Sequence, residues 1–73
     1  MISISGPHID DIITYVDGNT IDGVNYRFVN KQGIKAIFET DSDDEEALLE
    51  KKVLKKELKA QFPALMLMLQ KER

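Results

Sequence analysis

Few residues of this 73-residue chain have the chemistry of a catalytic or metal-binding group. His8 is the single histidine and cysteine is absent, so histidine-assisted catalysis has one candidate and a site of several imidazoles or thiolates has none. Asp10 and Asp11 could form a carboxylate pair for acid and base work, but neighbouring helical residues point about 100° apart. We expect a solvated His8 after Pro7, and no enzyme activity.

The densest acidic run lies at residues 41–46, with the sequence Asp-Ser-Asp-Asp-Glu-Glu. Clustered carboxylates suit calcium or magnesium, but the run lacks the glycine of an EF-hand loop, and Val53 stands near the loop's end in place of a carboxylate residue. We interpret the run as a solvated helix start, where acidic residues are favoured anyway. The glycines are scattered as turn formers and make no phosphate loop, so the sequence indicates no metal, no cofactor and no small-molecule substrate.

A helical face with four lysines is predicted after the acidic run. Its members are Lys52, Lys55, Lys56 and Lys59. Single-stranded nucleic acids usually need aromatic platforms beside such a face, but Tyr26 and Phe28 are expected on the opposite side of their strand from Arg27. With a formal net charge of -3, the chain makes weak, salt-sensitive nucleic-acid binding an alternative function rather than the favoured one.

Length and composition predict one small folded domain at residues 1–73. The apolar fraction is 42% and the charged fraction 32%, values that are ordinary for a folded chain, and the length leaves no room for a second core. The absence of cysteine favours a reducing compartment, with the cytoplasm as the default. Residues 1–6 have no basic region and no long apolar run, so we expect neither a signal peptide nor a membrane span.

Two periodic patterns open the chain. Residues 2–5 alternate isoleucine with serine, as a short half-buried strand does. The apolar residues of the next segment are Ile9, Ile12, Ile13 and Val16. Their spacing indicates a helix over 8–16, with Gly18 placed for a left-handed cap, but residues 12–16 are strand-preferring types. A helix and a strand therefore both stay open for this segment.

An antiparallel hairpin is predicted at about 24–39, because two segments there alternate apolar and polar residues. Pairing Asn30 with Ile34 leaves a loop at 31–33 and places Gly33 where a three-residue hairpin loop favours a left-handed residue. The facing pairs are then Phe28 with Ala36 and Tyr26 with Phe38. This register places the large apolar residues on one face.

A long helix is predicted at about 43–60, begun by a capping box with Ser42 as the cap and Glu45 as its partner. The helix is apolar on more than one side, so one side should meet the sheet and another a neighbouring helix or another molecule. After Pro63, the unbranched Leu and Met residues of 64–70 favour a helix, whereas their place in the element order favours a strand buried on both faces. We favour the strand and leave the helix open.

The element order predicts a small two-layer α+β sandwich with the β-α-β-β-α-β order of ferredoxin-like domains. Helices would cover one face of the sheet, and the open face together with the apolar C-terminal run would form an interaction surface. Its residues are Val29, Ile37, Leu65, Met66, Leu67, Met68 and Leu69. The hypothesis is a non-catalytic protein-interaction or regulatory module that acts as a homodimer or docks a protein partner, without contact to a membrane.

Overall fold

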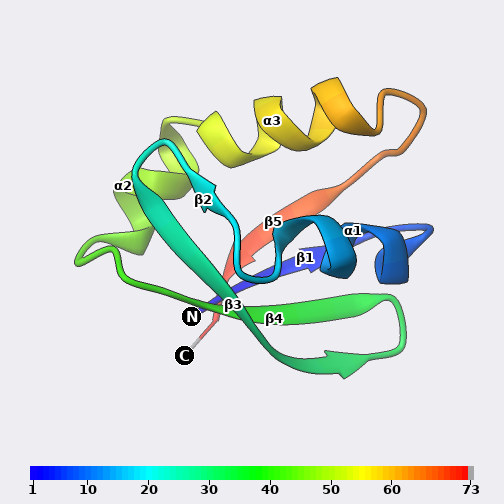
Figure 1. The fold of residues 1–73 in the computed structure, drawn as a ribbon, viewed down its shortest axis with the longest axis horizontal. Helices are drawn as coiled ribbons and strands as arrows, with labels where there is room; N and C mark the ends of the chain where they lie inside the picture. The colour runs from blue at the N-terminus through cyan, green and yellow to red at the C-terminus, as the bar shows by residue number, and fades with distance from the viewer. Residues whose placement is uncertain (73) are drawn as a thin grey trace.

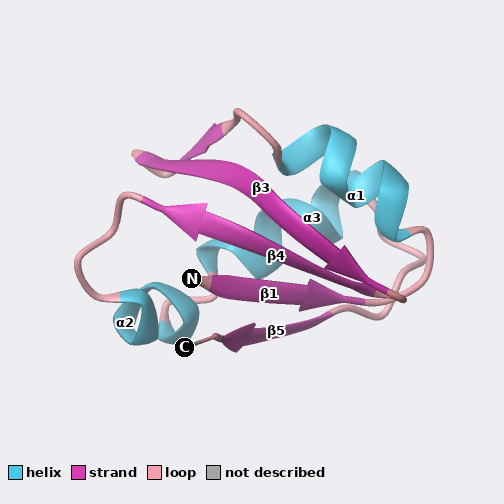
Figure 2. Ribbon diagram, turned by 90° about the horizontal axis from the view of Figure 1, so that it is seen from below, coloured by secondary structure: helices cyan, strands magenta, loops and turns pink. Residues whose placement is uncertain are grey.

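The computed structural model describes residues 1–72 of the chain. Its elements are β1 (Ile2–Ser5), α1 (Ile9–Val16), β2 (Thr20–Ile21), β3 (Val24–Gln32), β4 (Lys35–Thr40), α2 (Glu45–Glu50), α3 (Val53–Gln61) and β5 (Met68–Lys71) (Figure 1). Helices α1 and α3 lie on one face of a curled sheet, with α2 at one end (Figure 2). The predicted small α+β fold is confirmed. The short strand β2 and the division of the second helix were not in the predicted element series.

Within residues 1–72 the strands form one sheet, in the order β2-β3-β4-β1-β5, and every neighbouring pair is antiparallel. Strand β1 lies inside the sheet, where it pairs with β4 on one side and with the edge strand β5 on the other. Ile2 lies opposite Phe38 and Ile4 lies opposite Ala36, and all four side chains are buried. The core therefore lies between this face of the sheet and the helices.

Residues 9–16 form a helix, which decides between the two alternatives left open by the sequence. Ile9, Ile12 and Val16 are buried on one side of it. The chain leaves the helix through Gly18, whose φ of 74° lies in the left-handed region that glycine adopts without strain. Burial of one apolar face therefore outweighed the strand preference of the individual residues.

The predicted register of the β3–β4 hairpin is wrong. Asn30 lies opposite Ile37 instead of Ile34, and the loop contains two residues instead of three. Gly33 begins that loop with a φ of 60°, so the predicted role of glycine as the left-handed turn residue holds in a shorter turn. The two strands consequently stay paired closer to the turn than expected.

The shorter loop shifts the pairing next to the turn by three residues, and a β-bulge reduces this shift to two residues farther along the strands. Phe28 faces Phe38 and Tyr26 faces Thr40, so both predicted facing pairs are wrong, and the pairing shifts between Phe28 and Asn30. A displacement of two residues keeps each side chain on its original face of the sheet, so the hydrophobic pattern alone does not distinguish the two registers. The observed register brings the two phenylalanine rings into edge contact, with centroids 5.9 Å apart.

The single helix predicted at about 43–60 is wrong, because the chain forms two helices, α2 and α3. Lys52 separates them with a φ of 58°, which is outside the helical range. Residues six positions apart on one continuous helix point about 120° away from each other. The break lets Leu48 and Leu54 both be buried in the core.

No helix among the described residues is long and apolar enough to cross a membrane.

The predicted cap of that helix is also wrong by two residues. Asp44, and not Ser42, is the N-cap of α2, and its carboxylate accepts a hydrogen bond from the backbone N–H of Ala47 at 3.1 Å. Glu45 does not complete a capping box, because its carboxylate instead contacts the amino group of Met1. Acidic residues were expected at this helix start, but Asp44 was not expected to be the cap.

The last strand is confirmed, but it begins later than predicted and lies at the edge of the sheet. Residues 65–67 have no regular structure, and β5 follows them. Only Leu69 of β5 is half-buried and its other residues are exposed, so the expectation of a strand buried on both faces is wrong. The central place next to β4 is taken by β1.

Candidate functional site

The apolar run at 65–69 presents its side chains alternately to the core and to solvent. Leu65, Leu67 and Leu69 are half-buried and pack against the core. Met66 and Met68 are 88% and 59% exposed. The three leucines of the predicted interaction surface are therefore largely covered by the chain itself, and the two methionines remain accessible.

The other two residues of the predicted interaction surface lie apart from this run. Val29 is exposed at the bulge in β3, and Ile37 is half-buried on the sheet face that the helices do not cover. Strand β1 separates Ile37 from β5 and presents Ser3 and Ser5 to that face. The open face is mainly polar, so the structure does not bring all the predicted residues into one apolar surface.

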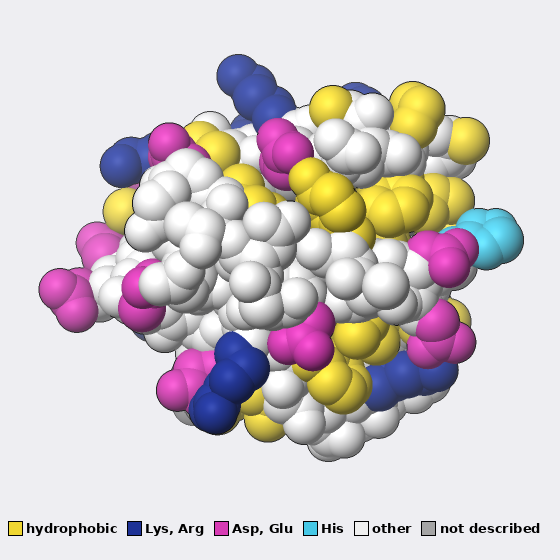
Figure 3. Space-filling view, viewed as in Figure 1, with side chains coloured by type: hydrophobic (Ala, Val, Ile, Leu, Met, Phe, Trp, Pro, Cys, Tyr) yellow, Lys and Arg dark blue, Asp and Glu magenta, His cyan; other side chains and the backbone are white. Residues whose placement is uncertain are grey.

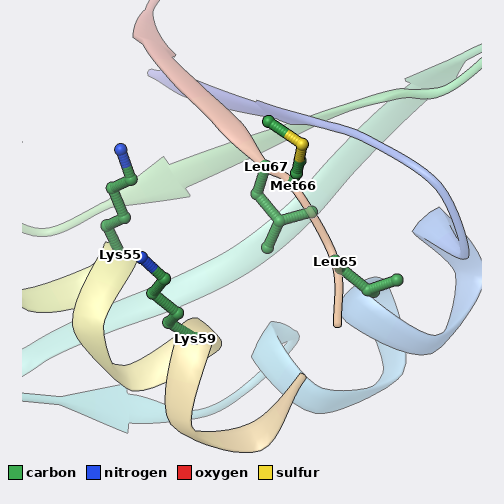
Figure 4. A pocket seen from close by; sticks show the side chains of 5 residues that line it. All are labelled: Lys55, Lys59, Leu65, Met66 and Leu67. Carbon is green, nitrogen blue, oxygen red and sulfur yellow. The ribbon is translucent and has the colours of Figure 1, made fainter. Parts of the chain in front are cut away.

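A groove runs between α3 and the segment that leads into β5, and we call it the α3–β5 groove. One cavity of about 160 Å³ is lined by Lys55, Lys59, Leu65, Met66 and Leu67 (Figure 4). A second cavity of about 320 Å³ is lined by Leu49, Lys52, Lys55, Leu67, Met68 and Leu69. The two cavities share Lys55 and Leu67, so they adjoin. The predicted basic face and the predicted apolar run meet in this groove. The sequence predicted them as two separate features.

The lysines of the groove have no counter-charge from the chain. Within residues 1–72, no carboxylate oxygen lies within 4.0 Å of the ammonium group of Lys52, Lys55 or Lys59. Lys56, the fourth member of the predicted basic face, is exposed but lines neither cavity. Basic side chains project from the side of the molecule where α3 lies (Figure 3). The groove therefore combines an apolar floor with unneutralised positive charge.

The residues considered as catalytic candidates lie at the surface, at the start of α1. His8 is exposed, and its Nδ1 lies 3.9 Å from a carboxylate oxygen of Asp11. Asp10 pairs with Lys31 at 2.7 Å, at the surface. No three His, Asp or Glu side chains of the described residues lie close enough together to hold a metal ion.

Two residues with shifted pKa values, Asp41 and Tyr26, line another cavity, of about 220 Å³, near the start of β3. Backbone and side-chain hydrogen bonds from Asn25 lower the pKa of Asp41. Burial raises the pKa of Tyr26 to about 12, with the nearby Asp22 and Asp41 adding to the effect. Both shifts lead away from neutral pH, which is the opposite of what general acid and base catalysis needs.

An ion pair on the open face of the sheet was not anticipated. Lys35 contacts Glu72, and this contact is the main reason why the pKa of Glu72 is lowered. Lys35 lies opposite Ser5 of β1, while Glu72 lies near Met1 at the other end of that strand, so the pair crosses over Ser3. Ser3 is fully buried as a result. The polar open face is thus partly closed by the chain itself.

Comparisons with protein-family models, curated proteins and solved structures found no match for this chain. The functional argument therefore rests on the geometry of the α3–β5 groove.

Proposed function

We propose that this chain is a non-catalytic protein-interaction module whose binding surface is the α3–β5 groove. The observation that carries the proposal is Met66, which is 88% exposed at the edge of a cavity that it shares with Lys55 and Lys59. Leaving such a side chain in water forgoes about 1.5–3 kcal/mol that burial would provide. Methionine is flexible and polarisable, and it is frequent on surfaces that bind other proteins. A protein partner that covers Met66 and Met68 would gain this energy.

Site-specific cross-linking tests this surface. Met66 is replaced by photo-reactive p-benzoylphenylalanine, and a matched control carries the same group at Ile34, which is 64% exposed in the β3–β4 turn. After illumination in native cell extract, we expect a discrete protein adduct from position 66 and none from position 34. Equal adducts from both positions, or an adduct from position 34 alone, would contradict the proposal.

Self-association is one form that this interaction would take, and a homodimer stays a prediction. It is supported by the exposed Met66 and Met68 and by the position of β5 at the sheet edge. Light scattering over a concentration series, on wild type and on a Met66→Lys, Met68→Lys variant, tests it. A dimer that the folded variant loses supports the prediction. A wild type that stays monomeric while the variant unfolds in circular dichroism excludes it.

Nucleic-acid binding remains the alternative function, and the four exposed lysines favour it. No aromatic side chain is among the residues that line the two cavities, so only phosphate contacts are offered there. We expect weak binding to oligonucleotides near physiological salt. A sub-micromolar affinity would make nucleic-acid binding the favoured function, provided that a triple substitution of Lys52, Lys56 and Lys59 abolishes it.

We infer, as a finer statement about the fold, that β1, β3, β4 and β5 with α1 and α3 form the β-α-β-β-α-β arrangement of ferredoxin-like domains. The strand order and the two helices on one face support this inference, and β2 and α2 would then be additions. An experimental structure that pairs the strands in another order would exclude it.

A cytoplasmic location is likewise a proposal, supported by the absence of cysteine. Microscopy of a tagged chain in its native cell tests it.

A further inference from the structure

The acidic segment at 39–46 is engaged within the chain, so it does not supply a counter-charge to the groove of a second copy. Its contacts are Glu39 with Arg27, Asp41 with Asn25, Asp44 with Ala47, Glu45 with Met1 and Glu46 with Lys71. Asp43 is the remaining acidic residue of the segment, and it is exposed. This segment is therefore a poor source of counter-charge for Lys52, Lys55 and Lys59.

The outer edge of β5 offers a place for an extended chain beside the groove. This strand is the last in the sheet order and is hydrogen-bonded to β1 on one side only (Figure 2). An edge strand presents a row of unpaired N–H and C=O groups that a further strand can use. Leu69 lies on the helix-facing side of β5, because it is opposite the buried Ile4. Alternate side chains of an added strand would therefore face the layer that contains α3.

The spacing of the lysines matches such a strand. Lys55 and Lys59 are four residues apart on α3, which corresponds to about 6 Å along a helix. Alternate residues of an extended strand are about 6.6 Å apart and point to the same side. Two acidic side chains at alternate positions of an extended segment can therefore reach the two lysines together. The methylene groups of glutamate would lie over Leu67, which both cavities share.

We propose that the α3–β5 groove binds an extended acidic segment of a partner protein, which adds to the edge of β5 and places glutamate side chains at alternate positions against Lys55 and Lys59. The proposal rests on the proposed function and names the partner of the same surface. The acidic segment of a second copy would have to leave its contacts within its own chain to occupy the groove. A nucleic acid is disfavoured by the apolar floor of the groove.

Fluorescence anisotropy with a dye-labelled synthetic peptide of about eight residues, alternating Glu and Leu, tests the proposal on the full chain. A control peptide of the same composition carries its Glu residues consecutively. A Lys55→Glu, Lys59→Glu variant removes the groove charges. A Lys51→Glu, Lys56→Glu variant makes the same change in net charge at exposed lysines outside both cavities.

The alternating peptide should bind wild type, and the groove variant should weaken it by about tenfold or more, as expected for direct charge contacts. The control variant should weaken it by less than about threefold, because exposed charges act weakly at a distance. Equal loss in both variants, equal binding of the consecutive-Glu peptide, or tighter binding of an oligothymidylate of the same length would overturn the proposal.

The two proposals fail separately. Absence of peptide binding together with an adduct from the photo-reactive group at position 66 would overturn the acidic occupant and leave the interaction surface in place. Absence of both would overturn both.

Discussion

The chain carries an acidic segment at 39–46 and a mainly basic segment at 52–59, where four lysines accompany Glu57, and the surroundings of the two segments differ. In the first, carboxylates cap a helix, hold the amino group of Met1 and accept hydrogen bonds from Asn25. In the second, the lysines contact no carboxylate among residues 1–72, and Lys52, Lys55 and Lys59 border an apolar groove. The sequence indicates a solvated helix start for the first segment and a basic helix face for the second, and the contacts in the structure add this further difference. Under the proposed function, the acidic segment serves folding and the lysines of the α3–β5 groove serve binding.

The largest expected effect separates the two sides of α3. Leu58 is fully buried, so Leu58→Ala should reduce the free energy of unfolding by about 2–5 kcal/mol through lost burial and a cavity. Lys56→Ala on the exposed side of the same helix should change it by less than about 0.5 kcal/mol. Urea denaturation followed by circular dichroism measures both. Similar values for the two variants would show that α3 is not held by its apolar side.

The next effect concerns the acidic segment. Asp44→Ala removes the N-cap of α2 and should cost about 1 kcal/mol of stability. Asp43→Ala, at the neighbouring exposed position, should change stability by less than about 0.5 kcal/mol. Both variants lose one negative charge, so the difference reports the cap itself. If Asp43→Ala were as costly as Asp44→Ala, the segment would act through its net charge.

A pH dependence should follow from Asp41. Hydrogen bonds from Asn25 hold the pKa of Asp41 below its usual value, so the carboxylate is favoured in the folded state. The stability that it contributes is present above the unfolded pKa of about 4 and is lost as the pH falls through the lower folded pKa. Asp41→Ala should therefore be less stable than wild type at neutral pH, with a smaller difference in strong acid. Urea titrations at both pH values measure this, and a constant difference would contradict it.

The smallest expected effect is on the basic face. Lys55→Ala with Lys59→Ala should alter stability by less than about 0.5 kcal/mol, because neither ammonium group has a carboxylate partner among residues 1–72. Thermal denaturation of wild type and variant compares them. A loss comparable to that of Asp44→Ala would show that these lysines serve the fold, and the contrast between the two charged runs would disappear.

Local patterns predicted the fold where one short-range signal decided the structure. The spacing of Ile9, Ile12 and Val16 indicated the helix α1, and Gly18 indicated its end. The alternation in β1, β3 and β4 gave the correct faces. It did not give the register, because a shift of two residues preserves the faces and the bulge after Phe28 has no glycine to mark it.

The candidate site was predicted only as separate parts. The lysines at 52–59 and the run at 65–69 were both recognised, but their meeting depends on β5 returning beside α3. The break at Lys52 is a left-handed residue without the glycine that usually signals one, so one continuous helix was the natural prediction. The two apolar sides of that predicted helix were the available sign of a break that buries both.

The most direct test of the account is a nuclear magnetic resonance titration of the ¹⁵N-labelled full chain with the alternating Glu and Leu peptide. The account predicts that amide shift changes concentrate at 52–59 and 65–70, while the amides of 39–46 stay unchanged. If the largest changes occurred at 39–46, or if the changes were spread evenly over the surface, the account would be contradicted. In the account, the acidic segment serves folding and the lysines of the groove serve binding.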